Sequence, residues 1–270
     1  SKIVQADCEL LGKREGSTPV IFFSLGRSGS SITWMTMANL TRAFTGACET
    51  TGGNPKESRR FFDGLENNKH IDKTWASKLL CDIQHRVIDE AGLTNGIVGF
   101  QWKGFMHSIM RNFSLDTLRE VGSHSNPKIK VVYLVRNYLD HIISKQKHLA
   151  MKEDSIKLAH CRPEDNECLK KHESYGKLNL SPSDLMSKLE KFAHTEEATE
   201  ALFRKAKIKY IKVSYEKLYN DGHDASEWMD IFRYLERGPQ EGLTMDDVRA
   251  TFEYTKTSKQ SHREILSNIE

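Results

Sequence analysis

The sequence lacks several features that would assign it to a common class of protein. It has no apolar run long enough to span a bilayer, and no signal peptide is visible at its start. Its five cysteines form no Cys-x-x-Cys pair, and its eleven histidines lack the spacing of metal ligands. The net charge is only +3, without the basic excess that a nucleic-acid-binding domain shows. We therefore expect no membrane contact from this segment, no metal site and no nucleic-acid partner.

The length of the chain sets its expected organisation. With 270 residues, it is long enough to bury a large core. We expect a polar leading segment over residues 1–17 and a single domain over residues 18–270. The polar stretch at about 151–182 has few apolar anchors and predicts a mobile lid or insertion. The chain begins at Ser1 and ends at Glu270 within an expected helix, so an origin in a longer protein is an open alternative.

Apolar runs and helical patterns alternate along the chain. The runs predict four strands, at residues 20–24, 97–102, 131–135 and 208–213. Helical spacing predicts helices at residues 30–44, about 75–88, 184–207 (one long helix or a broken pair) and 226–236, the last stopped by Gly238 and Pro239. Thr244 and Asp247 predict a capping box at the start of a further helix. This alternation indicates an α/β fold, a three-layer α/β/α arrangement with a mainly parallel sheet, in which phosphate sites lie at the carboxyl ends of strands.

The most informative segment is residues 20–40, VIFFSLGRSGSSITWMTMANL. A buried strand, a loop of small residues and a helix N-terminus together form a cradle for phosphate, because backbone N–H groups and the helix dipole favour an anion. Gly26 and Gly29 let the backbone approach the anion, and Arg27 adds a full charge. The loop hydroxyls can cap the helix or bind phosphate oxygens: Ser28, Ser30 and Ser31. The pattern GRSGSS is a relative of the loop GxxxxGK[ST] and not an example of it, and an ordinary strand–turn–helix with serine caps is the alternative.

A second segment, residues 130–147, has the sequence KVVYLVRNYLDHIISKQK. An apolar strand ends at Arg136, and the following helix carries Ser144 eight residues later. A strand-end arginine and a helical serine are common separately. It is much less common by chance for one chain to contain the first motif followed by this second one.

Together, the two motifs resemble those of the sulfotransferases that use 3′-phosphoadenosine 5′-phosphosulfate (PAPS). The resemblance implies a P-loop-like sulfotransferase fold, with PAPS as cofactor, adenosine 3′,5′-bisphosphate as product and no metal. It also implies that Arg136 and Ser144 bind the 3′-phosphate. The 5′-phosphosulfate would be bound by the first loop, through Arg27, Ser28, Gly29, Ser30 and Ser31. The sequence GRSGSS is closer to the branch that acts on tyrosyl proteins and carbohydrates than to the cytosolic branch.

The resemblance also suggests catalytic residues. Arg27 would stabilise the leaving phosphate, and Lys103, at the end of a strand, resembles a lysine of the cytosolic branch near the transferred group. For the base there are two candidates. Glu49, 22 residues after Arg27, resembles a glutamate of the tyrosyl-protein and carbohydrate branch. His107 is the alternative, although its spacing from Lys103 departs from the cytosolic pattern.

Two later segments complete the expected cofactor site. Tyr215 lies in a strand-end YExL sequence, and the family's tyrosine at this place lies near the adenine. The basic run that contains Lys256, Thr257 and Ser258 resembles the segment that closes over the nucleotide, although the RKG triplet of the cytosolic branch is absent. The alternatives are a tyrosine packed at a strand end and a solvated start of a helix.

The resemblance implies transfer of a sulfuryl group from PAPS to a hydroxyl of a carbohydrate, a peptide, a lipid or a small natural product. A small-molecule kinase of the P-loop type and an inactive module that binds adenosine bisphosphate are the rival functions. Cys161 and Cys168 bracket a polar loop in a way that could close a disulfide, and two unpaired thiols are the alternative. We expect a soluble domain, and both the Golgi lumen and the cytoplasm are open as its location.

Overall fold

The computed structural model describes residues 8–11, 16–25, 28–41, 73–92, 95–103, 115–124, 129–153, 165–168, 170, 178, 180–219 and 225–252. The chain divides into two compact units. The first comprises Ser1–Val135 and Thr199–Thr251, and the second comprises Arg136–Ala198 and Phe252–Glu270. Each unit is described separately below. The expected single domain over residues 18–270, with its lid, stays a prediction.

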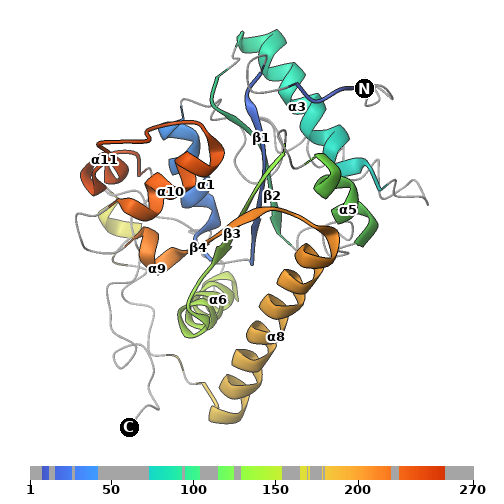
Figure 1. The fold of residues 1–270 in the computed structure, drawn as a ribbon. Coiled ribbons are helices and arrows are strands. Elements are labelled where there is room, and N and C mark those ends of the chain that lie inside the picture. Colours follow the sequence, from blue (N-terminus) through green and yellow to red (C-terminus); the bar gives the residue numbers. More distant parts are fainter. Residues whose placement is uncertain are drawn as a thin grey trace. The chain divides into compact units, whose positions relative to one another are not determined.

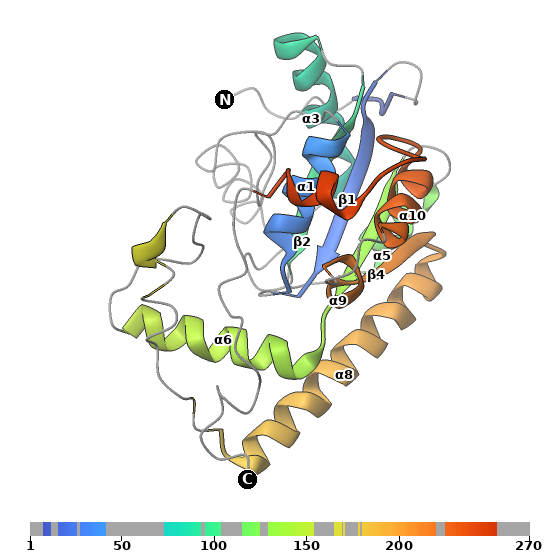
Figure 2. The ribbon, with the colours of Figure 1, turned by 90° about the vertical axis from the view of Figure 1, so that its left-hand side faces the viewer.

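The first unit is built on a parallel sheet of four strands, in the order β2-β1-β3-β4 (Figures 1 and 2). The strands are β1 (Thr18–Ser24), β2 (Ile97–Lys103), β3 (Lys130–Val135) and β4 (Tyr210–Ser214). Every residue of β1 is buried, as expected for the interior of a parallel sheet. Because all four strands are parallel, their carboxyl ends lie at the same edge of the sheet. The predicted α/β fold with a parallel sheet is confirmed.

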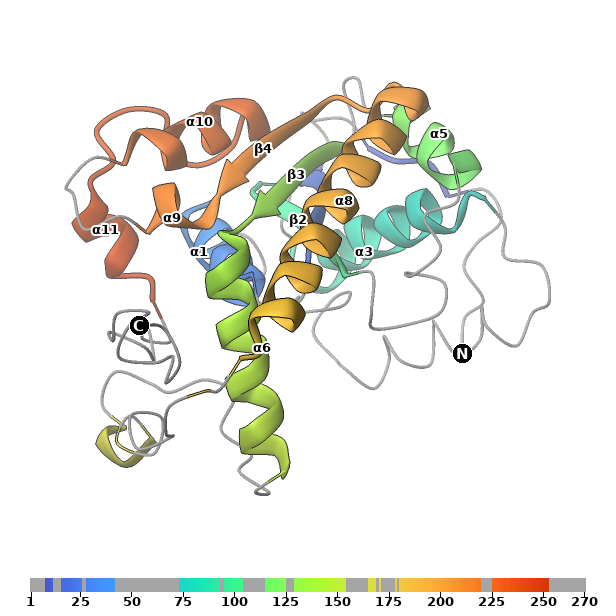
Figure 3. The same cartoon turned by 90° about the horizontal axis from the view of Figure 1, so that it is seen from below.

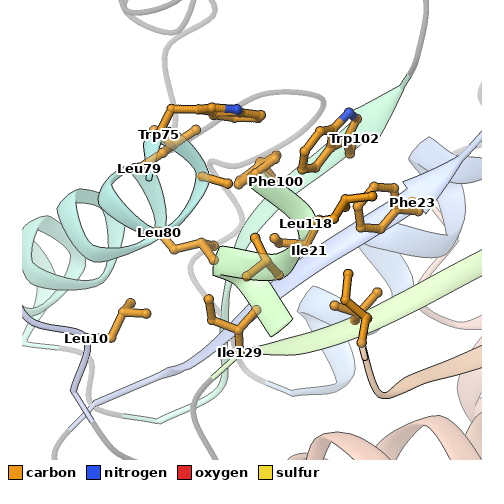
Figure 4. Packing of buried hydrophobic residues seen from close by; sticks show 14 of the residues in the cluster. Leu10, Ile21, Phe23, Trp75, Leu79, Leu80, Phe100, Trp102, Leu118 and Ile129 are labelled. Atoms are coloured by element: carbon orange, nitrogen blue, oxygen red, sulfur yellow. The ribbon is translucent and has the colours of Figure 1, made fainter. Parts of the chain in front are cut away.

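Helices α3 (Trp75–Ala91) and α5 (Leu115–His124) cover one face of this sheet, together with the last turns of α8 (Pro182–Ala206). Large aromatic side chains fill the space between them (Figure 4). Phe23 stacks on Trp102 with a centroid separation of 4.8 Å, and Trp75 lies 4.8 Å from the same ring. This cluster forms the main core of the unit.

Helices α1 (Ser30–Leu40) and α10 (Ser226–Leu235) cover the opposite face (Figures 1 and 2). On this side the ring of Phe22 in β1 meets Trp34 of α1 edge-on, with centroids 6.1 Å apart. The two short helices α9 (Tyr215–Leu218) and α11 (Met245–Arg249) follow β4 and α10 respectively (Figure 3). The described part of the first unit therefore has the three layers that the sequence predicts.

The second unit contains α6 (Tyr138–Glu153) and most of α8. A small apolar cluster holds it together, with Ile142, Ile143 and Leu180 at its centre and Phe192 at its margin. The segment 182–206 forms one continuous helix, so the alternative of a broken pair is wrong.

Some helices differ from the sequence predictions. Helix α1 ends at Leu40, before the predicted end at residue 44. Helix α5 was not expected, because only a few apolar residues at helical spacing mark its ten-residue length. Helix α10 ends at Leu235, next to the predicted end at Glu236. Glu236 already adopts a left-handed conformation (φ 55°), and the chain turns again at Gly238 (φ 78°).

Candidate functional site

The candidate site lies at the carboxyl edge of the sheet. Ser24 ends β1, Lys103 ends β2 and Ser214 ends β4, and Tyr215 follows directly. The register pairs Ser24 with Lys103, so the loop after β1 begins beside the end of β2. Arg136 follows the last residue of β3 in the chain. Ligands of open parallel sheets bind at this edge. Of the predicted site residues, Lys103 ends a strand, and Arg136 and Tyr215 each directly follow one in the chain.

The turn from β1 into α1 depends on Gly29. It is the N-cap of α1 and adopts a left-handed conformation (φ 84°), which glycine tolerates at little cost. Gly29 has no side chain with which to cap the helix, and the hydroxyl of Ser28 donates to the carbonyl of Leu25 instead. Ser28 and Ser30 are buried. The N-terminus of α1 thus keeps the partial positive charge that favours an anion.

Tyr215 lies directly against Gly29. A Cβ atom added to Gly29 would lie 2.2 Å from Cε2 of the Tyr215 ring, so a larger residue would displace the ring. The position therefore requires glycine for two reasons, its positive φ and this contact. Two residues that the sequence assigned to one cofactor site from separate motifs are in contact.

Tyr219 extends this arrangement, and sequence reasoning missed it. Its hydroxyl is hydrogen-bonded to the Thr33 hydroxyl at 3.2 Å, and Thr33 Oγ1 donates to the Gly29 carbonyl at 3.0 Å. The rings of Tyr215 and Tyr219 lie 4.6 Å apart. Burial raises the pKa of Tyr219, so its hydroxyl keeps its proton at neutral pH. In the sequence, only its position four residues after Tyr215, one helical turn away, could have indicated that Tyr219 lies near the site.

Buried polar groups also lie next to the candidate site on the face that α1 covers. Gln101 pairs in register with Phe22, whose ring meets α1, and its amide group is fully buried. Among the described residues, neither polar atom of this amide has a hydrogen-bond partner, and the same holds for the hydroxyl of Ser24. The buried amide of Gln101 lies two residues before the carboxyl end of β2, so unpaired polar atoms lie close to the strand end.

In the second unit, Arg136 and Ser144 flank the start of α6. The Asn137 side chain caps this helix by accepting from the backbone N–H groups of Leu139 and Asp140, at 3.0 and 3.3 Å. Lys147, one turn after Ser144, is buried, and this burial lowers its pKa. Ser144 and Lys147 share one side of α6 because they are three residues apart. Lys147 is a basic residue that sequence reasoning did not single out.

Several predicted residues lie outside the described residues, and their roles stay predictions. These are Arg27, Glu49, His107, Lys256, Thr257 and Ser258, together with the side chain of Lys103. The same is true of most of the stretch 151–182.

A disulfide joins Cys8 to Cys81, with 6.0 Å between their Cα atoms, and was not predicted from the sequence. Cys168 is also disulfide-bonded, while Cys161, its candidate partner from the sequence, lies outside the described residues. His85 lies close to Cys8 and Cys81, within 4.8 Å between possible ligand atoms. Since both cysteines are oxidised, they do not offer the thiolates that a metal ion requires. In the described part of the chain, no helix is long and apolar enough to cross a membrane.

A comparison of the sequence with models of known protein families found no match, and a comparison with curated proteins found none either.

Proposed function

We propose that this protein transfers a sulfuryl group from PAPS to a hydroxyl of an acceptor molecule. The observation that carries the proposal is the contact between Gly29 and Tyr215 at the N-terminus of α1. Gly29 belongs to the motif proposed for the 5′-phosphosulfate, and Tyr215 belongs to the segment proposed for the adenine. A nucleotide with its phosphates at the helix N-terminus would thus have an aromatic ring beside it.

Several segments of the chain would bind the cofactor. The β1–α1 loop supplies backbone N–H groups and Arg27 to the 5′-phosphosulfate. Arg136 and Ser144 bind the 3′-phosphate, and the resemblance of their spacing supports this role. Lys147 adds a buried cation to the same helix as Ser144.

The reaction is a direct displacement at sulfur. The acceptor oxygen forms a bond to sulfur while the bond between sulfur and the 5′-phosphate oxygen breaks, so that adenosine 3′,5′-bisphosphate leaves. Glu49 accepts the proton of the acceptor hydroxyl, with His107 as the second candidate for this role. Arg27 and Lys103 stabilise the negative charge that develops on the leaving phosphate and on the sulfuryl oxygens.

Two other functions are weaker on chemical grounds. A P-loop kinase binds phosphates with a Lys-Ser/Thr pair in its loop and holds Mg²⁺ with an acidic residue, and the sequence GRSGSS lacks that pair. An inactive module that only binds adenosine bisphosphate would need neither a candidate base nor a candidate cation for catalysis. Arg27, Glu49 and Lys103 are all present in the sequence.

Of the two compartments considered, the Golgi lumen fits the cysteines better than the cytoplasm. Cys8 and Cys81 form a disulfide and Cys168 is oxidised as well. Disulfides of this kind persist in oxidising compartments and are rare in the cytosol. We therefore propose a lumenal or extracellular site of action.

The test is incubation with labelled PAPS and a panel of saccharide, tyrosyl-peptide, phenol and lipid acceptors, with the product identified by mass. We expect a sulfated product with at least one class. Glu49→Gln should lower kcat by about 10²–10⁴-fold with little change in cofactor affinity, because it removes basicity and keeps the shape. His107→Ala should have a smaller effect. Phosphate transfer from ATP, with no sulfated product, would favour the kinase instead. If Glu49→Gln keeps normal turnover and His107→Ala abolishes it, the base is His107.

A further inference from the structure

The carbonyl of Gly29 accepts two hydrogen bonds, both from Thr33. It accepts hydrogen bonds from the backbone N–H of Thr33 at 3.1 Å and from the Thr33 hydroxyl at 3.0 Å. Thr33 is fully buried, so its hydroxyl has no competition from water. This carbonyl belongs to the left-handed residue at which the chain leaves the loop and enters α1.

The hydroxyl of Tyr219 completes the network. A hydroxyl carries one proton, so the Thr33 hydroxyl that donates to Gly29 must accept from the Tyr219 hydroxyl, 3.2 Å away. Tyr219 also packs against the ring of Tyr215, which in turn lies against the Cα of Gly29. Tyr219 therefore acts on Gly29 along two routes, one through the Thr33 hydroxyl and one through the Tyr215 ring.

Trp228, a residue of the core, contacts both Tyr219 and the residue before it. The indole Nε1–H of Trp228, a fully buried residue of α10, donates to the carbonyl of Leu218 at 2.8 Å. The Trp228 ring meets the Tyr219 ring edge-on, with centroids 5.7 Å apart. Because α10 is packed against β3 and β4, Tyr219 connects a rigid part of the first unit to the entrance of α1.

We propose that Tyr219 is a positioning residue, which fixes Gly29 and the N-terminus of α1 in the conformation that binds the phosphosulfate of the cofactor. Tyr219 does not touch the reacting atoms in this proposal. It holds the Gly29 carbonyl through Thr33, and it holds the Tyr215 ring that lies on Gly29. The inference rests on the proposed function only for the identity of the ligand.

Tyr234 offers a matched control. Its hydroxyl accepts from the backbone N–H of Val131 at 3.1 Å and donates to the carbonyl of Lys209 at 3.0 Å. Both partners lie at the amino ends of β3 and β4, the opposite edge of the sheet from the loop. Burial raises the pKa of Tyr234 as it does that of Tyr219. Tyr234→Phe therefore removes hydrogen bonds of a tyrosine hydroxyl without acting on Gly29.

The first measurement is the affinity for adenosine 3′,5′-bisphosphate by calorimetry, beside urea unfolding of each variant. We expect Tyr219→Phe to raise the Kd about tenfold, the loss that corresponds to one hydrogen bond, and Tyr234→Phe to leave it unchanged. Thr33→Val should have a similar effect, and the double variant Thr33→Val/Tyr219→Phe should add little, since both changes break one network. Equal Kd values for Tyr219→Phe and Tyr234→Phe would overturn the proposal.

The second measurement needs no ligand. Hydrogen exchange of the Thr33 amide, which is bonded to the Gly29 carbonyl, should be faster in Tyr219→Phe than in Tyr234→Phe at equal global stability. If the wild-type protein fails to bind the bisphosphate, the proposed function is wrong, but this exchange rate still decides the role of Tyr219. Equal exchange rates in the two variants would show that Tyr219 does not fix the entrance of α1.

Discussion

At the scale of single residues, two buried glutamines have opposite surroundings. Gln84 on α3 accepts from the backbone N–H of Leu11 at 2.7 Å and donates to the carbonyls of Leu11 and Ser17 at 3.2 and 2.6 Å. Its amide therefore fastens the segment before β1 to α3. The amide of Gln101 on β2 has no hydrogen-bond partner among the described residues. A buried polar group without a partner costs free energy, because it has lost its bonds to water.

This difference predicts opposite effects of the same substitution. Gln84→Met should lower the free energy of unfolding by roughly 2–4 kcal/mol, because it leaves backbone groups of Leu11 and Ser17 without partners. Gln101→Met should leave stability unchanged or raise it by about 1 kcal/mol, since it removes unpaired polar atoms and nearly conserves volume. Urea unfolding with unchanged m-values measures both. A large loss of stability in Gln101→Met would show that its amide is paired in solution.

The residues of the site were only partly predictable at this scale. Gly29 was identifiable, because a glycine in a loop between a buried strand and a helix lets the backbone approach an anion. Its left-handed conformation was not predicted. Tyr215 was identifiable only through the resemblance to a family. Thr33 and Tyr219 were not, since a hydrogen bond between residues far apart in sequence depends on the packing of α9 against α1, which local pattern does not specify.

At the scale of elements, the strongest local signal was the start of α11. The Thr244 hydroxyl accepts from the backbone N–H of Asp247 at 3.2 Å, and the Asp247 carboxylate accepts from the backbone N–H of Thr244 at 2.9 Å. The predicted capping box is thus confirmed. These bonds hold the pKa of Asp247 below its usual range.

The capping box predicts a pH dependence of stability. Because the folded-state pKa of Asp247 is lowered, its contribution is present above its unfolded pKa of about 4 and is lost as the pH falls through the folded pKa. The difference in stability between wild type and Asp247→Asn should therefore shrink on acidification. Thr244→Ala should cost about 1 kcal/mol at neutral pH. Urea unfolding between pH 3 and pH 7 measures both effects, and a constant difference over this range would contradict the account.

Other elements were less predictable because their signals are short or weak. The four strands were found within two residues of their ends, since runs such as residues 131–135 are apolar on both faces. Helix α5 was missed, because Leu115, Leu118 and Val121 are its only regularly spaced apolar residues. The end of α10 was predicted to within one residue, and Glu236 takes there the left-handed conformation that glycine usually adopts.

At the scale of the whole molecule, the Cys8–Cys81 disulfide closes a loop of 73 residues that includes β1 and α1. Cysteine spacing alone does not determine which cysteines pair, so the sequence did not predict it. In the same region, the Gln84 side chain and Arg237 hold the segment before β1. Arg237 donates to the Gly16 carbonyl at 2.8 Å and to the Thr18 hydroxyl at 2.9 Å.

Removal of this disulfide should destabilise the folded protein. Cys8→Ser/Cys81→Ser should lower the free energy of unfolding by about 2–5 kcal/mol, since the unfolded chain gains the freedom of a long open loop. Urea unfolding without reductant measures the effect, with the oxidised wild type as the reference. Equal stability of the two proteins would show that Cys8 and Cys81 are not bonded in solution.

The central claim is that the protein binds an adenosine nucleotide with a 3′-phosphate, and calorimetry with adenosine 3′,5′-bisphosphate in the presence of a chelator tests it most directly. We predict binding without Mg²⁺, a loss of about ten- to a hundredfold in affinity for Arg136→Ala, and a smaller loss for Ser144→Ala. Binding of ATP with Mg²⁺, together with no binding of the bisphosphate, would contradict the account and favour a kinase.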